Sequence, residues 1–196
     1  MRRTSVLGWL AALVLVASPA FAADAAPKTK KIDNPEFASW SKFAVGAFVE
    51  LTTVSDSMGQ KSTSKMTHKL VELTADKAVV ETAMVLEGVP AEFAPKPERR
   101  DVPKTIEVPD VETPTQNPDV KVVEGEETID VAGTSVKCKT TESTVTASGM
   151  TTKSKTWTSD GVPGLMAKME MRSEGKVGEM TILTTASTTV TKWAAK

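Results

Sequence analysis

The stretch that decides the fold is Leu165-Met-Ala-Lys-Met-Glu-Met-Arg172. Its odd positions are all apolar, and its even positions become charged from Lys168 onward. Successive side chains of a β-strand point to opposite faces of the sheet. The alternation therefore predicts a strand with one apolar and one charged face.

The same period of two recurs along most of the chain. The segments that show it are 45–54, 60–73, 78–87, 120–123, 127–131, 135–146, 151–159, 165–172 and 180–190. Short turns join most of them, which is typical of an antiparallel meander, and sheets of this size tend to curl. We predict a mainly β protein, with an antiparallel, strongly curled sheet or partly open barrel of about nine or ten strands and one short N-terminal helix.

The helix is expected over about 35–43. Asp33 or Asn34 suits the N-cap and Pro35 the first helical position. Trp40 and the neighbouring phenylalanines follow at helical spacing, so we expect their aromatic side to be buried against the sheet.

The N-terminus has the pattern of an export signal. Arg2 and Arg3 precede a short apolar run, and Ala20-Phe21-Ala22 fits a cleavage site. The run is too short to span a bilayer, and no transmembrane segment is expected in the mature chain. We predict a signal peptide over 1–22, a flexible leader over 23–32 and a secreted or periplasmic protein.

A single β domain is expected over 33–196, interrupted by a proline-rich insert at 89–118. The insert contains seven of the eleven prolines of the chain. Proline donates no hydrogen bond to a sheet ladder, so central strands are excluded there and only a brief edge strand is expected, near 105–108. We expect the insert to be more mobile than the rest of the chain, and the fold to survive its shortening.

Composition limits the class of partner. Removing 1–22 removes two basic and no acidic residues, so 22 basic residues face 25 acidic ones, a net charge of −3. Nucleic acids and anionic membranes favour basic surfaces, so no nucleic acid is expected as a partner. With a single cysteine, the chain forms no intrachain disulfide.

The predicted inner face of the sheet is the candidate site. Met66, His68, Met84, Met169 and Met171 are expected to line an apolar pocket there. Methionine also fills gaps in solid cores, and its thioether is a soft ligand that binds Cu(I). Packed thioethers would not turn toward an ion, so we predict no metal site and no cofactor.

No catalytic constellation is present. His68 lacks a nucleophile or orienting carboxylate in a known pattern, and Cys138 has only lysines near it in sequence. Both are interpreted as packing residues, and no enzymatic activity is expected.

Several segments also resemble known proteins. They are residues 127–133, 136–139 and 156–165, together with Trp40, Phe43, Gly46 and Phe48. These resemble uncharacterised secreted bacterial β-proteins and, more distantly, domains of unknown function similar to the periplasmic lipoprotein-carrier half-barrel. The resemblance covers about 40–54 and 120–193, and it implies a fold but no reaction.

The sequence thus predicts a secreted, non-enzymatic β-protein that binds an apolar, lipid-like ligand or a protein partner in the cell envelope. Two alternatives remain. One is a purely structural or interaction module with a solid core, and the other is a methionine-based copper binder.

Overall fold

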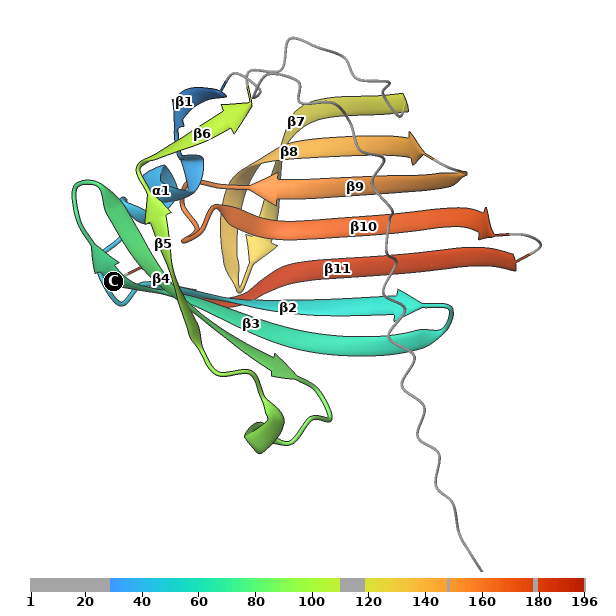
Figure 1. Cartoon of the computed structure of the whole chain (residues 1–196), viewed down its shortest axis with the longest axis horizontal. Coiled ribbons are helices and arrows are strands. Elements are labelled where there is room, and N and C mark those ends of the chain that lie inside the picture. Colours follow the sequence, from blue (N-terminus) through green and yellow to red (C-terminus); the bar gives the residue numbers. More distant parts are fainter. Residues whose placement is uncertain (1–28, 110–118, 148, 178–179, 196) are drawn as a thin grey trace, which may run out of the picture.

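A computed structural model describes residues 29–109, 119–147, 149–177 and 180–195, and this part of the chain is mainly β (Figure 1). The predicted signal peptide, residues 23–28 and residues 110–118 lie outside the described residues. The main sheet contains β2 (Phe48–Ser57), β3 (Gln60–Leu73), β4 (Lys77–Leu86), β5 (Glu98–Pro103), β7 (Asp119–Val131), β8 (Thr134–Ala147), β9 (Met150–Thr158), β10 (Met166–Val177) and β11 (Met180–Ala194). A second sheet pairs β1 (Thr29–Asp33) with β6 (Thr105–Pro109).

The nine strands follow the order β5-β4-β3-β2-β11-β10-β9-β8-β7, and every neighbouring pair is antiparallel. Two meanders therefore form the sheet, one from β2 to β5 and one from β7 to β11. They meet where the first strand, β2, pairs with the last, β11. The predicted antiparallel meander is confirmed.

The expected strong curl and partial barrel are wrong: the sheet is neither closed nor strongly curled. Its two edges, β5 and β7, do not pair with each other among the described residues. The physical reason lies in where the apolar side chains are. They gather at one end of the sheet, whereas the other end has polar side chains on both faces, so closure would bury no apolar interior there.

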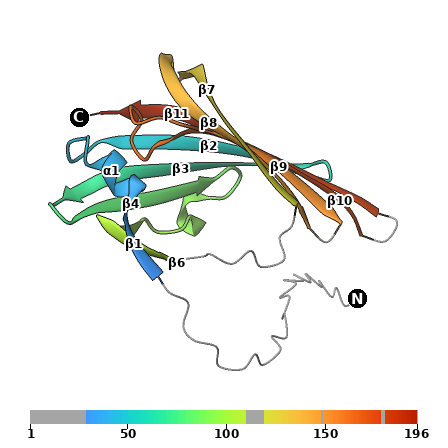
Figure 2. The same ribbon diagram turned by 90° about the horizontal axis from the view of Figure 1, so that it is seen from above.

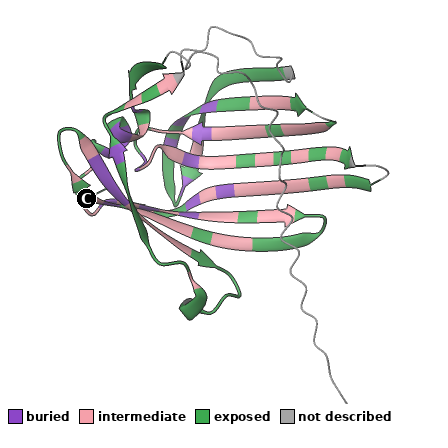
Figure 3. Cartoon of the chain, viewed as in Figure 1, coloured by how far each residue is buried: buried purple, intermediate pink, exposed green. Residues whose placement is uncertain are grey.

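The core lies at the end of the sheet that bears the helix α1 (Pro35–Trp40), as the buried residues in Figure 3 show. Its largest buried side chains include Trp40, Leu70 and Val49, and Trp157 is 5 % exposed. Figure 2 shows α1, β1 and β6 on the same side of the sheet. The burial of Trp40 confirms the expectation that the aromatic side of the helix packs against the sheet.

The helix begins where the sequence predicts and ends about three residues earlier. The side chain of Asn34 caps it by accepting a hydrogen bond from the backbone N–H of Glu36 at 3.0 Å. The same side chain donates to the carbonyl oxygen of Pro103 at 2.8 Å, which fastens the helix to the end of β5.

Part of the insert belongs to the fold. After a 3-10 turn at Ala91–Phe93, β5 forms an edge strand beside β4 and buries Val102 in the core. The β6 strand covers the predicted edge strand at 105–108, but it pairs with β1 in the separate small sheet. That pairing places residues 29–32, the end of the expected flexible leader, in a strand.

Candidate functional site

The charged side chains of the five central strands all lie on one face of the sheet. Cross-strand partners share a face, and the register of β9, β10, β11, β2 and β3 is continuous apart from local bulges. We call this the charged face; its charged residues are Lys153, Lys155, Lys168, Glu170, Arg172, Glu174, Lys176, Lys192, Glu50, Asp56, Lys61, Lys65, Lys69 and Glu72.

The opposite face of the same strands has no Asp, Glu, Lys or Arg. We call it the neutral face; away from the core its residues are Thr152, Ser154, Thr156, Met169, Met171, Ser173, Thr184, Ala186, Thr188, Thr53, Ser55, Ser57, Ser62, Ser64, Met66 and His68. Many hydroxyls bond across strands, as between Thr53 and Thr188 at 2.9 Å and Ser55 and Ser62 at 2.7 Å. These bonds satisfy the hydroxyls without charge.

The five predicted pocket residues share the neutral face but form two separate groups. Met66 and Met84 are cross-strand partners on β3 and β4, and His68 lies two residues further along β3. Met169 and Met171 lie on β10, three strands from β3 in the order of the sheet. At a strand spacing of about 4.8 Å, the groups are about 14 Å apart.

His68 is half-buried and bonded. Its Nδ1 lies 2.8 Å from the Thr82 hydroxyl, the partner opposite it on β4. Burial lowers the pKa of the imidazole, and the nearby positive charge of Arg100 lowers it further, whereas Glu36 acts in the opposite direction. The ring is therefore largely neutral at neutral pH.

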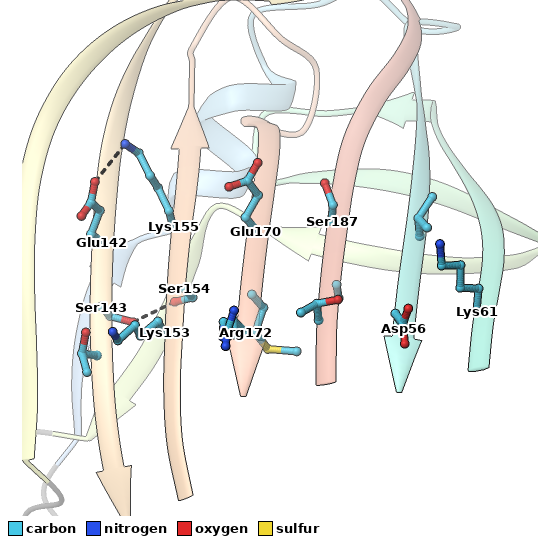
Figure 4. A pocket seen from close by; sticks show the side chains of 15 residues that line it. Asp56, Lys61, Glu142, Ser143, Lys153, Ser154, Lys155, Glu170, Arg172 and Ser187 are labelled. Carbon is cyan, nitrogen blue, oxygen red and sulfur yellow. Dashed lines mark hydrogen bonds and ion pairs between the residues drawn. The ribbon is translucent and has the colours of Figure 1, made fainter. Parts of the chain in front are cut away.

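A groove of about 660 Å³ crosses the strands on the charged face (Figure 4). One wall is the row Glu142, Lys155, Glu170, Ser187 and Val54, and the other is the row Thr144, Lys153, Arg172, Thr185, Asp56 and Lys61. Between these rows lie Ser143, Ser154, Met171 and Ala186, whose side chains belong to the opposite face by register, so their backbone forms the floor of the groove.

Sequence reasoning missed this groove, although the alternation in 165–172 gave the direction of the β10 side chains. Of the predicted pocket residues only Met171 lines it, and its position is in the floor. Ion pairs neutralise part of the charge of the walls. Lys155 binds Glu142 at 2.9 Å, and Lys168 binds the wall residue Glu170 at 2.7 Å. Exposed pairs of this kind contribute only about 0–1 kcal/mol each, so the groove is a solvated surface of mixed charge.

Trp157 is the large aromatic residue of the charged face. Its indole N–H donates to Glu127 at 2.8 Å, and the ammonium groups of Lys155 and Lys168 lie 5.0 and 4.8 Å from its ring centroid. Hydrogen bonds from Lys155 and then from Trp157 lower the pKa of the Glu127 carboxyl. These contacts cover the ring, so Trp157 is not an exposed binding platform.

The surroundings of Cys138 do not favour a reactive thiol. Cys138 is buried, and burial raises the pKa of its thiol, which disfavours the reactive thiolate. In the described residues, no three His, Cys, Asp or Glu side chains are grouped so as to hold a metal ion. The helices of this part of the chain are too short or too polar to cross a bilayer.

No family model, no curated protein and no solved structure matches the chain.

Proposed function

We propose that this is a non-enzymatic binding protein of the cell envelope that contacts a protein partner through its neutral face. The observation behind the proposal is the separation of charge between the two faces of the same five strands. A sheet face that only meets water has no need to exclude charge. The same strands place all their charged residues on the other side.

A protein surface fits the neutral face better than a small apolar ligand does. Small-ligand sites are typically concave. Four hollows of the described residues, of about 660, 490, 430 and 490 Å³, are not lined by Met66, His68, Met84 or Met169. Five strands and three to four side-chain rows cover about 20 Å by 20 Å, or about 400 Å². Each side of a standard protein interface covers about 800 Å², so this area suits a transient contact.

Two further features support a binding role. The charge-free surface combines hydroxyls with polarisable thioethers, which adapt to a partner without desolvating charges. The N-terminal export signal predicted from the sequence would place this surface in the cell envelope. His68 and Cys138, the residues best suited to catalysis by type, have only packing and hydrogen-bonding surroundings.

Site-specific photocrosslinking in the cells that export the protein tests the proposal. A photoreactive residue would replace Ala186 or Ser55 on the neutral face, with Thr185 and Val54 on the charged face as controls one residue away. We expect one discrete crosslinked protein from both neutral-face positions and none from the controls. Crosslinks from the controls alone, or from no position, would overturn the proposal.

A fatty-acid probe distinguishes the small-ligand alternative. We expect no saturable binding of the probe to the purified mature chain. Saturable binding that Ala186→Glu abolishes and Thr185→Glu preserves would replace the protein partner with an apolar ligand on the same face.

A further inference from the structure

Contrary to the absence of a metal site expected from the sequence, we propose that Met66, Met84 and His68 form a binding site for a soft monovalent metal ion, Cu(I), on the β3–β4 hairpin. This site includes Met66 and His68 of the neutral face, but it does not depend on the partner proposed for that face. Met169 and Met171, the other methionines of the predicted pocket, lie on β10, three strands from β3, and do not belong to this site.

The register places the three residues next to one another on one face of the sheet. Met66 and Met84 are directly opposed across β3 and β4. Opposed residues of antiparallel strands have Cβ atoms about 4.5–5.5 Å apart, and the three rotatable bonds of methionine let both sulfurs reach a common point. His68 belongs to the next pair on the same face, so it is the neighbour of the methionine pair along β3.

The imidazole has one nitrogen available. Its Nδ1 bonds the Thr82 hydroxyl, and Nε2 has no partner among the described residues. Among the described residues, the buried side-chain nitrogen or oxygen without a partner is Nε1 of Trp40. Nε2 of His68 is therefore not fully buried, and an incoming ion can reach it. With the proton on Nδ1, donated to Thr82, Nε2 presents a lone pair. Such an outer hydrogen bond usually orients a metal-binding histidine.

The donor set favours a soft ion of single charge. Thioethers are soft ligands that select Cu(I), and imidazole also binds copper. All three ligands are neutral, so they do not offset the charge of a hard divalent cation. The two charged residues that act on His68, Arg100 and Glu36, form an ion pair with each other. They therefore add little net charge beside the site.

The second methionine pair provides a matched control. Met169 and Met171 lie on the same face, but their cross-strand partners are Thr156, Ser154, Thr188 and Ala186. Neither an imidazole nor a thiolate is opposite them. Methionine-to-leucine changes nearly conserve volume and cost less than about 1.5 kcal/mol, so both pairs can be replaced without unfolding the chain.

The experiment is an anaerobic Cu(I) titration of the mature chain against a chromogenic Cu(I) chelator, with Ag(I) as a redox-inert probe. We expect one ion per chain. Loss of an outer-shell partner typically lowers metal affinity about 10–100-fold, so Met66→Leu with Met84→Leu should lower it at least about tenfold. Met169→Leu with Met171→Leu should leave it unchanged.

Two further measurements make the test decisive. X-ray absorption of the Cu(I)-loaded chain should show sulfur and nitrogen neighbours, and Thr82→Val, which keeps all three ligands, should weaken binding. If Met66→Leu disturbs folding, Met84→Leu alone replaces the double variant. No binding by the wild-type chain, equal loss in both methionine pairs, or copper with sulfur neighbours only would overturn the proposal.

Discussion

At the scale of single residues, His68 is a titratable group whose pKa the fold changes. Its imidazole is half-buried, hydrogen-bonded to Thr82, and placed near Arg100 and Glu36. Burial, the largest cause, lowers the pKa of His68 below the ordinary value of about 6.5. The folded chain therefore takes up a proton at His68 less readily than the unfolded chain does.

This difference predicts how stability depends on pH. Below about pH 6.5 the unfolded chain binds a proton at His68 before the folded chain does, so acidification favours unfolding. For the metal-free protein, the free energy of unfolding should fall as the pH drops from about 6.5 through the lowered pKa of the folded state. Denaturant titrations at several pH values measure this slope, and His68→Gln should reduce it. An unchanged slope in the variant would contradict the assignment.

At the scale of elements, the turn between β9 and β10 packs against the helix α1. The N–H of Leu165 donates to the carbonyl of Val162 at 3.0 Å, and Gly164 has a φ of 75°. With Pro163 before it, this is the type II turn that the Pro-Gly sequence predicts. An added Cβ at Gly164 would lie 3.3 Å from Cζ2 of Trp40, so the turn packs directly against the buried aromatic of α1.

Comparing Gly164→Ala with Gly59→Ala separates the cost of a positive φ from the cost of crowding Trp40 at Gly164. Both positions have positive φ, which costs an L-residue about 1–2 kcal/mol, but the space around Gly59 is empty. Gly164→Ala should therefore lose about 1 kcal/mol more than Gly59→Ala, because it also overpacks Trp40. Chemical denaturation of both variants measures the difference. Equal losses would show that Trp40 yields without cost.

At the scale of the whole molecule, residues 98–103 of the insert support the core. The β5 strand places Val102, 1 % exposed, in the core, and Arg100 binds Glu36 of α1, with one contact at 3.0 Å. The fold therefore depends on residues 98–103. Their removal would uncover the helix as well as one edge of the sheet, so a shortening of the insert that the fold survives must spare these residues.

Val102→Ser tests this dependence, with Val122→Ser on the opposite edge strand as its control. Burying a valine contributes about 1.5–3 kcal/mol, so Val102→Ser should lower the free energy of unfolding by about that amount. Val122 is 56 % exposed, and its replacement should change the free energy by less than about 0.5 kcal/mol. Urea unfolding of both variants gives the comparison; a stable Val102→Ser protein would show that β5 is peripheral.

The sequence by itself determined those features that depend on local backbone geometry. Alternation in 165–172 predicted β10 and the direction of its charges, because side-chain direction in a strand follows from position alone. Asn34 and Pro35 marked the helix start, because capping involves only the first turn. Prolines correctly excluded central strands from 89–109, because they cannot donate to a ladder.

Only the tertiary structure decided which distant residues meet. Strand order places two strands, β2 and β11, between His68 and Met169, and register sets Met66 opposite Met84; neither follows from a period of two. The number of strands also does not determine whether the sheet closes into a barrel. Closure depends on whether apolar side chains from many strands meet over the whole length of the sheet, and here they meet only at the end covered by α1.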